Sequence, residues 1–413
     1  MRVALGALVL TIGCAACCRV PSAPARGAPP TVAPARVELP LGNRVPIEPD
    51  LAALPRTPDA APERPTTSLR HLTSSACQAL AAQNAPFAGA LDDEGRAACD
   101  SAAGRLASSL RYFAALDLRN QSAREALERF FQLAAAEAQA DLLRQAKPKL
   151  DFLHERAVGA RAAGVRFPLD PAETERQRSQ NLAQLEQTET SAELLNIDLK
   201  RRLGLPPDLE RLWPTGDFAV RAEPVDVGQA VSVALTDRPE LLGLRALREH
   251  LSPDVLPLAR EHLRRANPLL GAGLPTPPAS GLARFFGSRR GPSPEVLAEL
   301  AVRQRQLADL LATRERDVAA EAEAAVVALN AQVLRVQRAS DRLAGRVAQL
   351  DEAKRKRQAD QPGAELEEAQ LTLEVLTAHG AVLAEVFAWH QARVKLKAAQ
   401  GGLAWECLGA GPR

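Results

Sequence analysis

Cysteine and histidine are the residues of this chain best suited to metal or covalent chemistry, and their spacing excludes most of it. The six histidines are scattered, with no His-x-x-x-His pair, and no Cys-x-x-Cys pair occurs after residue 18. A zinc site needs three or four such ligands held close together, which usually appears as that short spacing. We therefore predict no metal site and no cofactor.

Acidic side chains are abundant, but no arrangement of them indicates catalysis. The chain contains no GxSxG elbow, Walker loop or dinucleotide fingerprint. Carboxylates alternate with arginines, as they do on solvated helix faces. Lys and Arg (52) nearly balance Asp and Glu (50), so the net charge of +2 favours neither nucleic acid nor acidic lipid. We predict that the protein is not an enzyme and does not bind nucleic acid.

The N-terminus has the pattern of an export signal. Met1-Arg2 provides a positive start, and Val3 to Ile12 form an apolar run too short to span a bilayer. Gly13-Cys14 then resembles a lipobox, in which the cysteine receives a diacylglycerol. Cys14 is the predicted lipidation site and Cys17 the fallback. Ordinary secretory cleavage, with unmodified cysteines, is the alternative.

Three cysteines remain in the body of the chain: Cys77, Cys99 and Cys407. Cys77 and Cys99 lie in one short region, and an exported protein meets an oxidising compartment. We predict a disulfide between Cys77 and Cys99.

Helix-forming residues dominate the body. Aromatic residues make up only 3% of the chain, and Ala, Leu, Arg and Glu lose little side-chain entropy in a helix. From Leu307 to Leu350 apolar residues recur at alternating spacings of three and four, which is the pattern of coiled-coil packing. The resulting helix of about 60 residues would span about 90 Å.

The pattern occurs twice, each time with a turn and a returning helix, so the predicted fold class is mainly α. It consists of long antiparallel α-helical hairpins with coiled-coil packing, internally repeated, with little or no β-barrel portion. Asp217 to Val220 is the one short strand that we predict in the connector. The predicted organisation is a signal region (1–18), a Pro/Ala-rich tether (19–70), a helical body (71–403) and a tail (404–413). The body divides into a first hairpin (about 102–205), a connector with a short helical pair (206–266), a Pro/Gly-rich membrane-proximal segment (267–293) and a second hairpin (294–403).

The middle of the chain resembles the TolC-like outer-membrane efflux family. A helix ending in Leu203-Gly204-Leu205-Pro206 leads to Ala234-Leu235 and then to Arg238-Pro239-Glu240-Leu241. The final segment, FAWHQARVKLKAAQGGL, is similar to the last helix of that family. The resemblance covers roughly residues 105 to 403 and rests on the order of these motifs.

The resemblance implies a homotrimer in the cell outer membrane, lipid-anchored here, with its body in the periplasm. In that family helical hairpins form a tunnel, and a periplasmic adaptor and an inner-membrane pump dock at the hairpin tips. The matching tips here are about 159–171 and 356–364. Candidate docking residues are Gly164 in the first tip and Lys354, Arg355, Lys356, Arg357 and Gly363 in or beside the second. The basic run is also explained by a solvated turn.

The regions where the family has membrane strands lack the expected alternation. A membrane strand needs about nine to eleven alternating residues, and neither the region before residue 102 nor 267–293 supplies two of them. The predicted function is an outer-membrane-anchored component of an efflux conduit for passive transport of small molecules or ions. The alternative is a non-channel envelope scaffold lipoprotein that binds partners through its hairpin tips.

Overall fold

The computed structural model describes residues 69–98, 101–216, 218–221, 223–268, 270 and 293–407. The signal region, the candidate lipidation sites Cys14 and Cys17, Cys99, and nearly all of the tether and of segment 267–293 lie outside the described residues. In chain order the described elements are β1 (Leu69–Thr73), α1 (Ser74–Gln83), α2 (Ala88–Arg96), α3 (Ala102–Ala162), α4 (Pro171–Arg202), β2 (Arg211–Thr215), α5 (Val227–Asp237), α6 (Pro239–Glu249), η2 (Pro253–Val255), α7 (Leu256–Ala266), α9 (Pro294–Gln358), α10 (Ala364–Ala399) and α11 (Gly402–Cys407).

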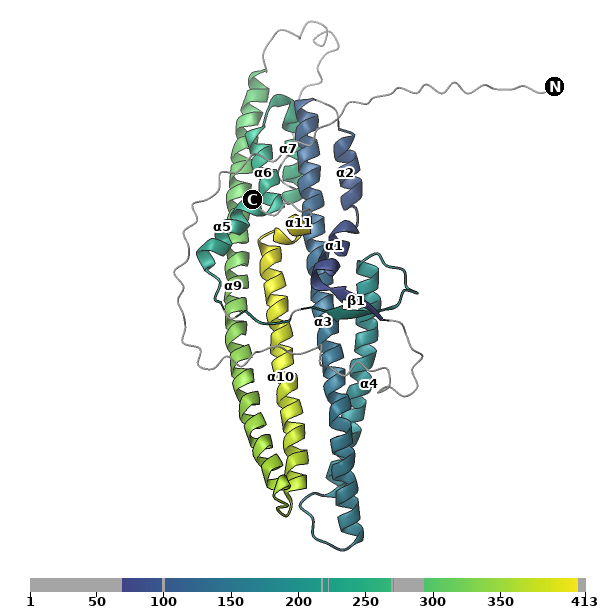
Figure 1. Ribbon diagram of the computed structural model, residues 1–413. Helices are drawn as coiled ribbons and strands as arrows, with labels where there is room; N and C mark the ends of the chain where they lie inside the picture. The colour runs from purple at the N-terminus through teal and green to yellow at the C-terminus, as the bar shows by residue number, and fades with distance from the viewer. Residues whose placement is uncertain are drawn as a thin grey trace, which may run out of the picture. The chain divides into compact units, whose positions relative to one another are not determined.

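Four long helices lie side by side in the order α4, α3, α10, α9 (Figure 1). Helices α3 and α4 form the first hairpin, α9 and α10 form the second, and α3 packs against α10 where the hairpins meet. α3 has 61 residues and α9 has 65, so each extends over roughly 90 to 100 Å. The predicted fold class of repeated long helical hairpins is confirmed.

Both long helices begin at a serine cap. The hydroxyl of Ser101 accepts a hydrogen bond from the Gly104 amide at α3, and Ser293 accepts one from Val296 at α9. Each cap satisfies an amide that the first turn of a helix leaves without a partner. The starts of both hairpins are therefore encoded locally.

The predicted strand at Asp217–Val220 is wrong. The strand in the connector is β2, which begins six residues earlier. It pairs in parallel with β1, with Leu69 opposite Arg211 and Thr73 opposite Thr215. Phe218 instead turns into the core, where it is 5% exposed. β2 forms where a second strand, β1, lies beside it. No pattern in the sequence predicted β1.

The predicted helical pair in the connector is in fact three helices, α5, α6 and α7, with the short η2 before α7. Pro239 separates α5 from α6, because proline has no amide hydrogen and restricts the residue before it to extended conformations. Arg238 has φ −62° and ψ 121°, and Pro239 opens α6 at its first turn. The prediction of a single helical pair therefore missed the break at Pro239.

The connection between α2 and α3 holds only residues 97–101. Two membrane strands would need about nine to eleven residues each. The chain therefore has no room at this point for the first strand pair of the family that its sequence resembles.

Among the described helices, α10 alone is apolar and long enough to cross a membrane by those two criteria, which is weak evidence for a span. α3 and α9 flank α10 on both sides, and 22% of its most apolar 18-residue window is buried.

Candidate functional site: two hairpin turns, two helix edges and a basic pocket

The first hairpin turn, between α3 and α4, is built around Gly164. Its φ of +67° is a conformation that favours glycine, and the turn closes with the Val165 amide donating to Ala160 O at 2.9 Å. Asp170 then caps α4, and Pro171 occupies its first turn. Gly164 faces open space, with no atom within 4 Å of an added Cβ.

The second turn, between α9 and α10, has Gly363 at φ +82°, also with open space around it. The two turns belong to the same end of the described body (Figure 1). Arg156 near the end of α3 and Glu365 at the start of α10 form an ion pair of 3.0 Å. The candidate docking glycines thus lie in turns at one end.

The basic run beside the second turn is largely neutralised by its own neighbours. Lys354 pairs with Asp351 at 3.4 Å, and Lys356 and Arg357 pair with Glu367 and Glu368 at 2.8 and 2.9 Å. Arg355 instead donates to the Asp351 carbonyl. Exposed pairs of this kind contribute little stability, but they reduce the positive charge available to an acidic partner.

Helices α4 and α9, at the two ends of the four-helix row, carry most of the exposed large apolar residues. Of 13 such residues in the described chain, eight lie on these two helices and none on α10. On α4 they are Leu182, Leu194 and Ile197, and on α9 they are Leu297, Val302, Val327, Leu334 and Val347. Leu194, Ile197 and Leu334 are 60 to 63% exposed.

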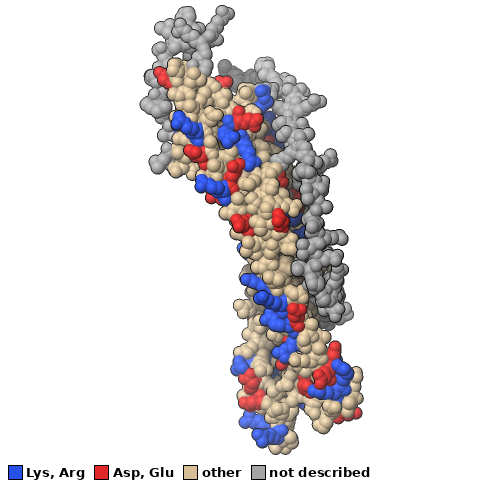
Figure 2. Space-filling model, turned by 90° about the vertical axis from the view of Figure 1, so that its left-hand side faces the viewer, with Lys and Arg blue, Asp and Glu red and all other residues tan. Residues whose placement is uncertain are grey.

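Figure 2 shows the α9 side of the body. Charged side chains occur along its length in clusters, with stretches between them that carry none. Exposed apolar residues that form a continuous patch usually mark an interaction surface. We define the exposed apolar residues of α4 and of α9 as the α4 edge and the α9 edge.

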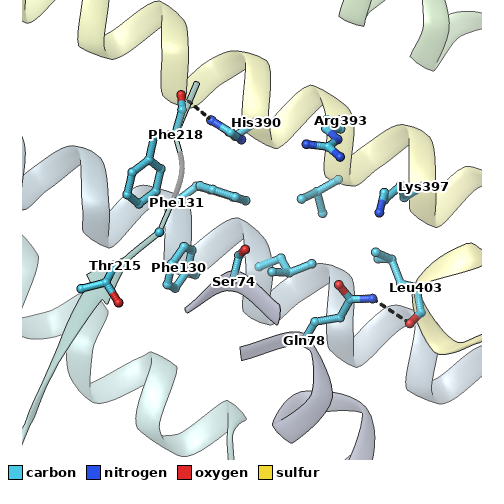
Figure 3. Close-up of a pocket in the computed structure, with 13 residues that line it drawn as sticks. Ser74, Gln78, Phe130, Phe131, Thr215, Phe218, His390, Arg393, Lys397 and Leu403 are labelled. Carbon is cyan, nitrogen blue, oxygen red and sulfur yellow. Dashed lines mark hydrogen bonds between the residues drawn. The ribbon is translucent and has the colours of Figure 1, made fainter. Parts of the chain in front are cut away.

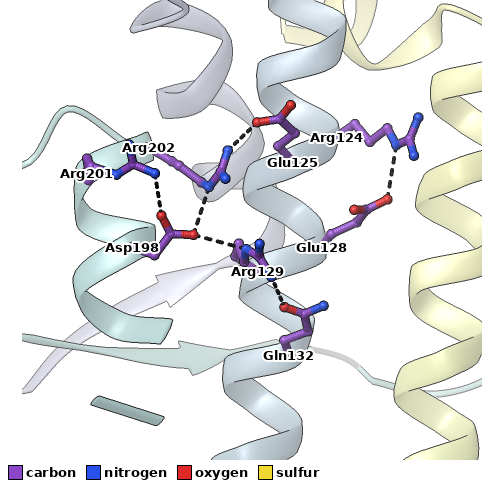
Figure 4. Close-up of polar contacts among 8 residues, drawn as sticks. All are labelled: Arg124, Glu125, Glu128, Arg129, Gln132, Asp198, Arg201 and Arg202. Atoms are coloured by element: carbon purple, nitrogen blue, oxygen red, sulfur yellow. Dashed lines mark hydrogen bonds and ion pairs between the residues drawn. The ribbon is translucent and has the colours of Figure 1, made fainter. Parts of the chain in front are cut away.

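A polar network joins α4 to α3 near the base of the first hairpin (Figure 4). Asp198 on α4 pairs with Arg129 on α3 at 3.0 Å, with Arg202 on its own helix at 3.0 Å, and with Arg201. Arg202 also reaches Glu125 on α3. Partial burial opposes ionisation of Asp198, but hydrogen bonds from Arg201 and Arg202 outweigh it and lower the pKa of that carboxyl.

A pocket of about 120 Å³ lies where α1, α3, α10, α11 and the end of β2 meet (Figure 3). Its floor is aromatic: Phe130, Phe131, Phe218 and His390 are each at most 6% exposed. The rings of Phe131 and His390 stack at 4.7 Å with 15° between their planes. His390 Nε2 lies 3.0 Å from the Phe218 carbonyl, and because a carbonyl only accepts, Nε2 carries the proton.

The rim of the pocket is polar and basic. Arg393 and Lys397 come from α10, Ser74 and Gln78 from α1, and Thr215 from β2. No acidic residue is among the 13 that line the pocket. Lys397 pairs with Glu406 of α11 at 2.7 Å, whereas Arg393 has no carboxylate within 4 Å among the described residues and lies over the Trp389 ring at 5.7 Å.

Cys77 is a free thiol in the structure. Its predicted partner Cys99 lies outside the described residues, so the disulfide between them stays a prediction. The Cys77 side chain is 0% exposed in the same core cluster as Leu127 and Phe130. Burial raises its pKa to about 12, which suppresses the thiolate needed for exchange. The thiol therefore behaves as a small core residue. Among the described residues no group of three potential metal ligands gathers.

Comparisons with known proteins agree on the architecture. No family model matches the sequence, and no curated protein does. Three solved structures illustrate the likeness. The outer-membrane channel OprN has a TM-score of 0.52 at 16% identity, over 73% of this chain and 70% of its own. The outer membrane protein VceC of Vibrio cholerae has 0.51 at 14%, over 73% and 74%, and CusC has 0.51 at 15%, over 73% of each chain.

The chain spans about two thirds to three quarters of the solved channels that it matches. At this identity the likeness concerns the fold. In sequence, the resemblance was carried by Leu203–Pro206 and Arg238–Leu241. The structural likeness covers about 73% of the chain, which includes most of the helical body. The described residues therefore have the fold of the TolC-like outer-membrane channels.

Proposed function

We propose that this protein is a passive component of an export conduit of the cell envelope, anchored to the outer membrane by a lipid on Cys14, in which three copies close into a tube. The observation that carries the proposal is the pair of apolar edges. A row of four helices with an apolar residue set exposed at each end is incomplete by itself. The α4 edge of one copy joined to the α9 edge of the next buries both.

The exposed residues that share a helix face support that pairing. Leu194 and Ile197, three residues apart, lie on one face of α4, and Val327 and Leu334, seven residues apart, lie on one face of α9. Joining two different edges is a head-to-tail contact, which closes into a ring when the rotation between copies allows it.

The turns at the far end of the hairpins are the surfaces that we assign to a periplasmic adaptor and, through it, an inner-membrane pump. Gly164 and Gly363 allow close backbone approach there, and the surrounding charges are mostly paired within the chain. A tube of this kind has no need for a substrate-binding pocket, so the transported molecules are small solutes or ions selected elsewhere.

Charged substitutions at the edges test the assembly. Leu194→Asp and Leu334→Asp each place a carboxylate where the contact would bury it, which costs several kcal/mol when unpaired. We expect the trimer to dissociate to single copies in light scattering of the mature protein in mild detergent. Val158→Asp is the matched control, since Val158 is 44% exposed but lies on α3, not on an edge. Trimers that survive both edge substitutions would contradict the proposal.

The α2–α3 connection of five residues favours a second candidate, a scaffold lipoprotein that forms no pore. Single-channel recording in planar bilayers separates the two. Stable conductance that is lost with Leu194→Asp supports the conduit. A trimer without conductance assigns the assembly to scaffolding.

A further inference from the structure

The pocket between α1, α3 and α10 is lined by more aromatic residues than the rest of the core. The whole chain has 14 Phe, Tyr and Trp residues. Five of them, together with His390, meet in one cluster of ring contacts: Phe130, Phe131, Phe218, Phe387 and Trp389. Most of the remaining core is Leu, Ala and Val. The pocket opens onto the most aromatic part of the described protein.

Two cations and one carboxylate lie at the mouth of the pocket. Arg393 and Lys397, one helical turn apart on α10, both line the pocket. Glu406 of α11 lies beside this rim, where it accepts hydrogen bonds from Lys397 at 2.7 Å and from Gln78 at 3.0 Å. Arg393 also lowers the pKa of Glu406 through its charge, but makes no ion pair with it. The first turn of α1 also lines it through Ser74, and a helix N-terminus carries a partial positive charge. Arg393 is the cation that retains its hydrogen-bonding groups for a ligand.

The pocket volume limits the ligand. Cavities on the order of 150 Å³ hold one benzene ring, and this one is about 120 Å³ and open on one side. We propose that the pocket binds a small planar carboxylate with a single aromatic ring. The ring lies against Phe131 and Phe218, and the carboxylate accepts hydrogen bonds from the Arg393 guanidinium, a pairing that is commonly bidentate.

The lining residues all belong to one copy of the chain, so binding does not depend on assembly or on the proposed transport function. The polar groups of the rim orient the carboxylate outward, toward water and the two cations. The buried floor gives the ring edge-to-face and stacked contacts of the kind that aromatic pairs prefer.

Fluorine NMR of 4-fluorobenzoate with the full mature protein in detergent tests this inference. We expect saturable binding that weakens about tenfold or more in Arg393→Gln, because a hydrogen bond to a charged group contributes roughly 1.5–3 kcal/mol. Lys395→Gln is the matched control, since Lys395 is exposed on the same helix, and it should bind as the original protein does. Far-UV circular dichroism verifies that both variants are folded.

Two further probes separate ring recognition from plain charge attraction. Fluorobenzene carries the ring without the charge, and inorganic phosphate carries charge without the ring. We expect fluorobenzene to bind more weakly than 4-fluorobenzoate and phosphate to leave 4-fluorobenzoate bound. Displacement by phosphate at equal concentration, an absence of saturable binding, or equal affinity in Arg393→Gln would overturn the inference.

Discussion

Replacing Phe130 by Ala is expected to lower the free energy of unfolding by about 3–5 kcal/mol, the usual cost of removing a fully buried Phe. Phe130 is 0% exposed on α3 and touches both Phe131 and Phe218, at ring distances of 5.2 and 6.4 Å. It thereby ties α3 to the segment after β2. The measurement is urea denaturation followed by far-UV circular dichroism at fixed protein concentration.

Phe87→Ala is the control for that prediction. Phe87 is 78% exposed in the turn before α2, so removing its ring leaves no cavity. The expected change in the free energy of unfolding stays within about 0.5 kcal/mol. Equal effects of the two substitutions would show that the region around Phe130 is not a packed core.

Glu299→Gln is expected to lower the free energy of unfolding by about 1.5–3 kcal/mol, because it removes the negative charge that accepts hydrogen bonds from Arg260 and Arg303. Glu299 on α9 accepts hydrogen bonds from Arg260 on α7, at 2.7 Å, and from Arg303 one turn along α9, at 3.1 Å. Glu299 and Arg303 are both 4% exposed. This triad is the polar link between α7 and the second hairpin.

The hydrogen bond from Arg260, followed by one from Arg303, lowers the pKa of Glu299 below its ordinary value despite burial. The stabilisation is therefore complete above the pKa of an unfolded Glu, about 4.3, and is lost as the pH falls through the lower folded-state value. The difference between the original protein and Glu299→Gln should shrink over that acidic range.

Two variants make this prediction specific. Glu261→Gln removes the exposed partner of Arg265 on α7, a pair with side chains 51% and 74% exposed, and should cost less than about 1 kcal/mol. Replacing Glu299 and Arg303 together by Met removes both buried charges and should recover most of the loss. If the double variant were as unstable as Glu299→Gln, helix geometry rather than charge would be the cause.

The long hairpins were predictable because their signals are local and repeated. The alternation from Leu307 to Leu350, the breaks at Gly164 and Gly363 and the serine caps all act within a few residues of one another. The resemblance carried by Leu203–Pro206 and Arg238–Leu241 predicted the correct architecture. The three solved channels named above are only 14 to 16% identical to this chain.

Features that depend on distant segments were not predictable. β1 forms only because β2, more than 130 residues later, lies beside it. The predicted alternation from Leu307 to Leu350 includes Val347, which is 39% exposed. Periodicity identifies the apolar face of a helix, but it does not say whether that face meets its own chain or another copy. The pocket was missed because its floor and rim come from segments between Ser74 and Leu403 that only the fold brings together.

Photo-crosslinking from the α4 edge tests the central claim, closure of three copies through unlike edges, most directly. p-Benzoylphenylalanine placed at position 194 of the full chain is irradiated in isolated membranes, and crosslinked peptides are identified by mass spectrometry. The account predicts crosslinks between copies to the α9 segment around Val327 and Leu334, with bands on denaturing gels that end at three copies. Crosslinks from α4 to α4, bands that continue beyond three copies, or no crosslinks between copies would contradict it.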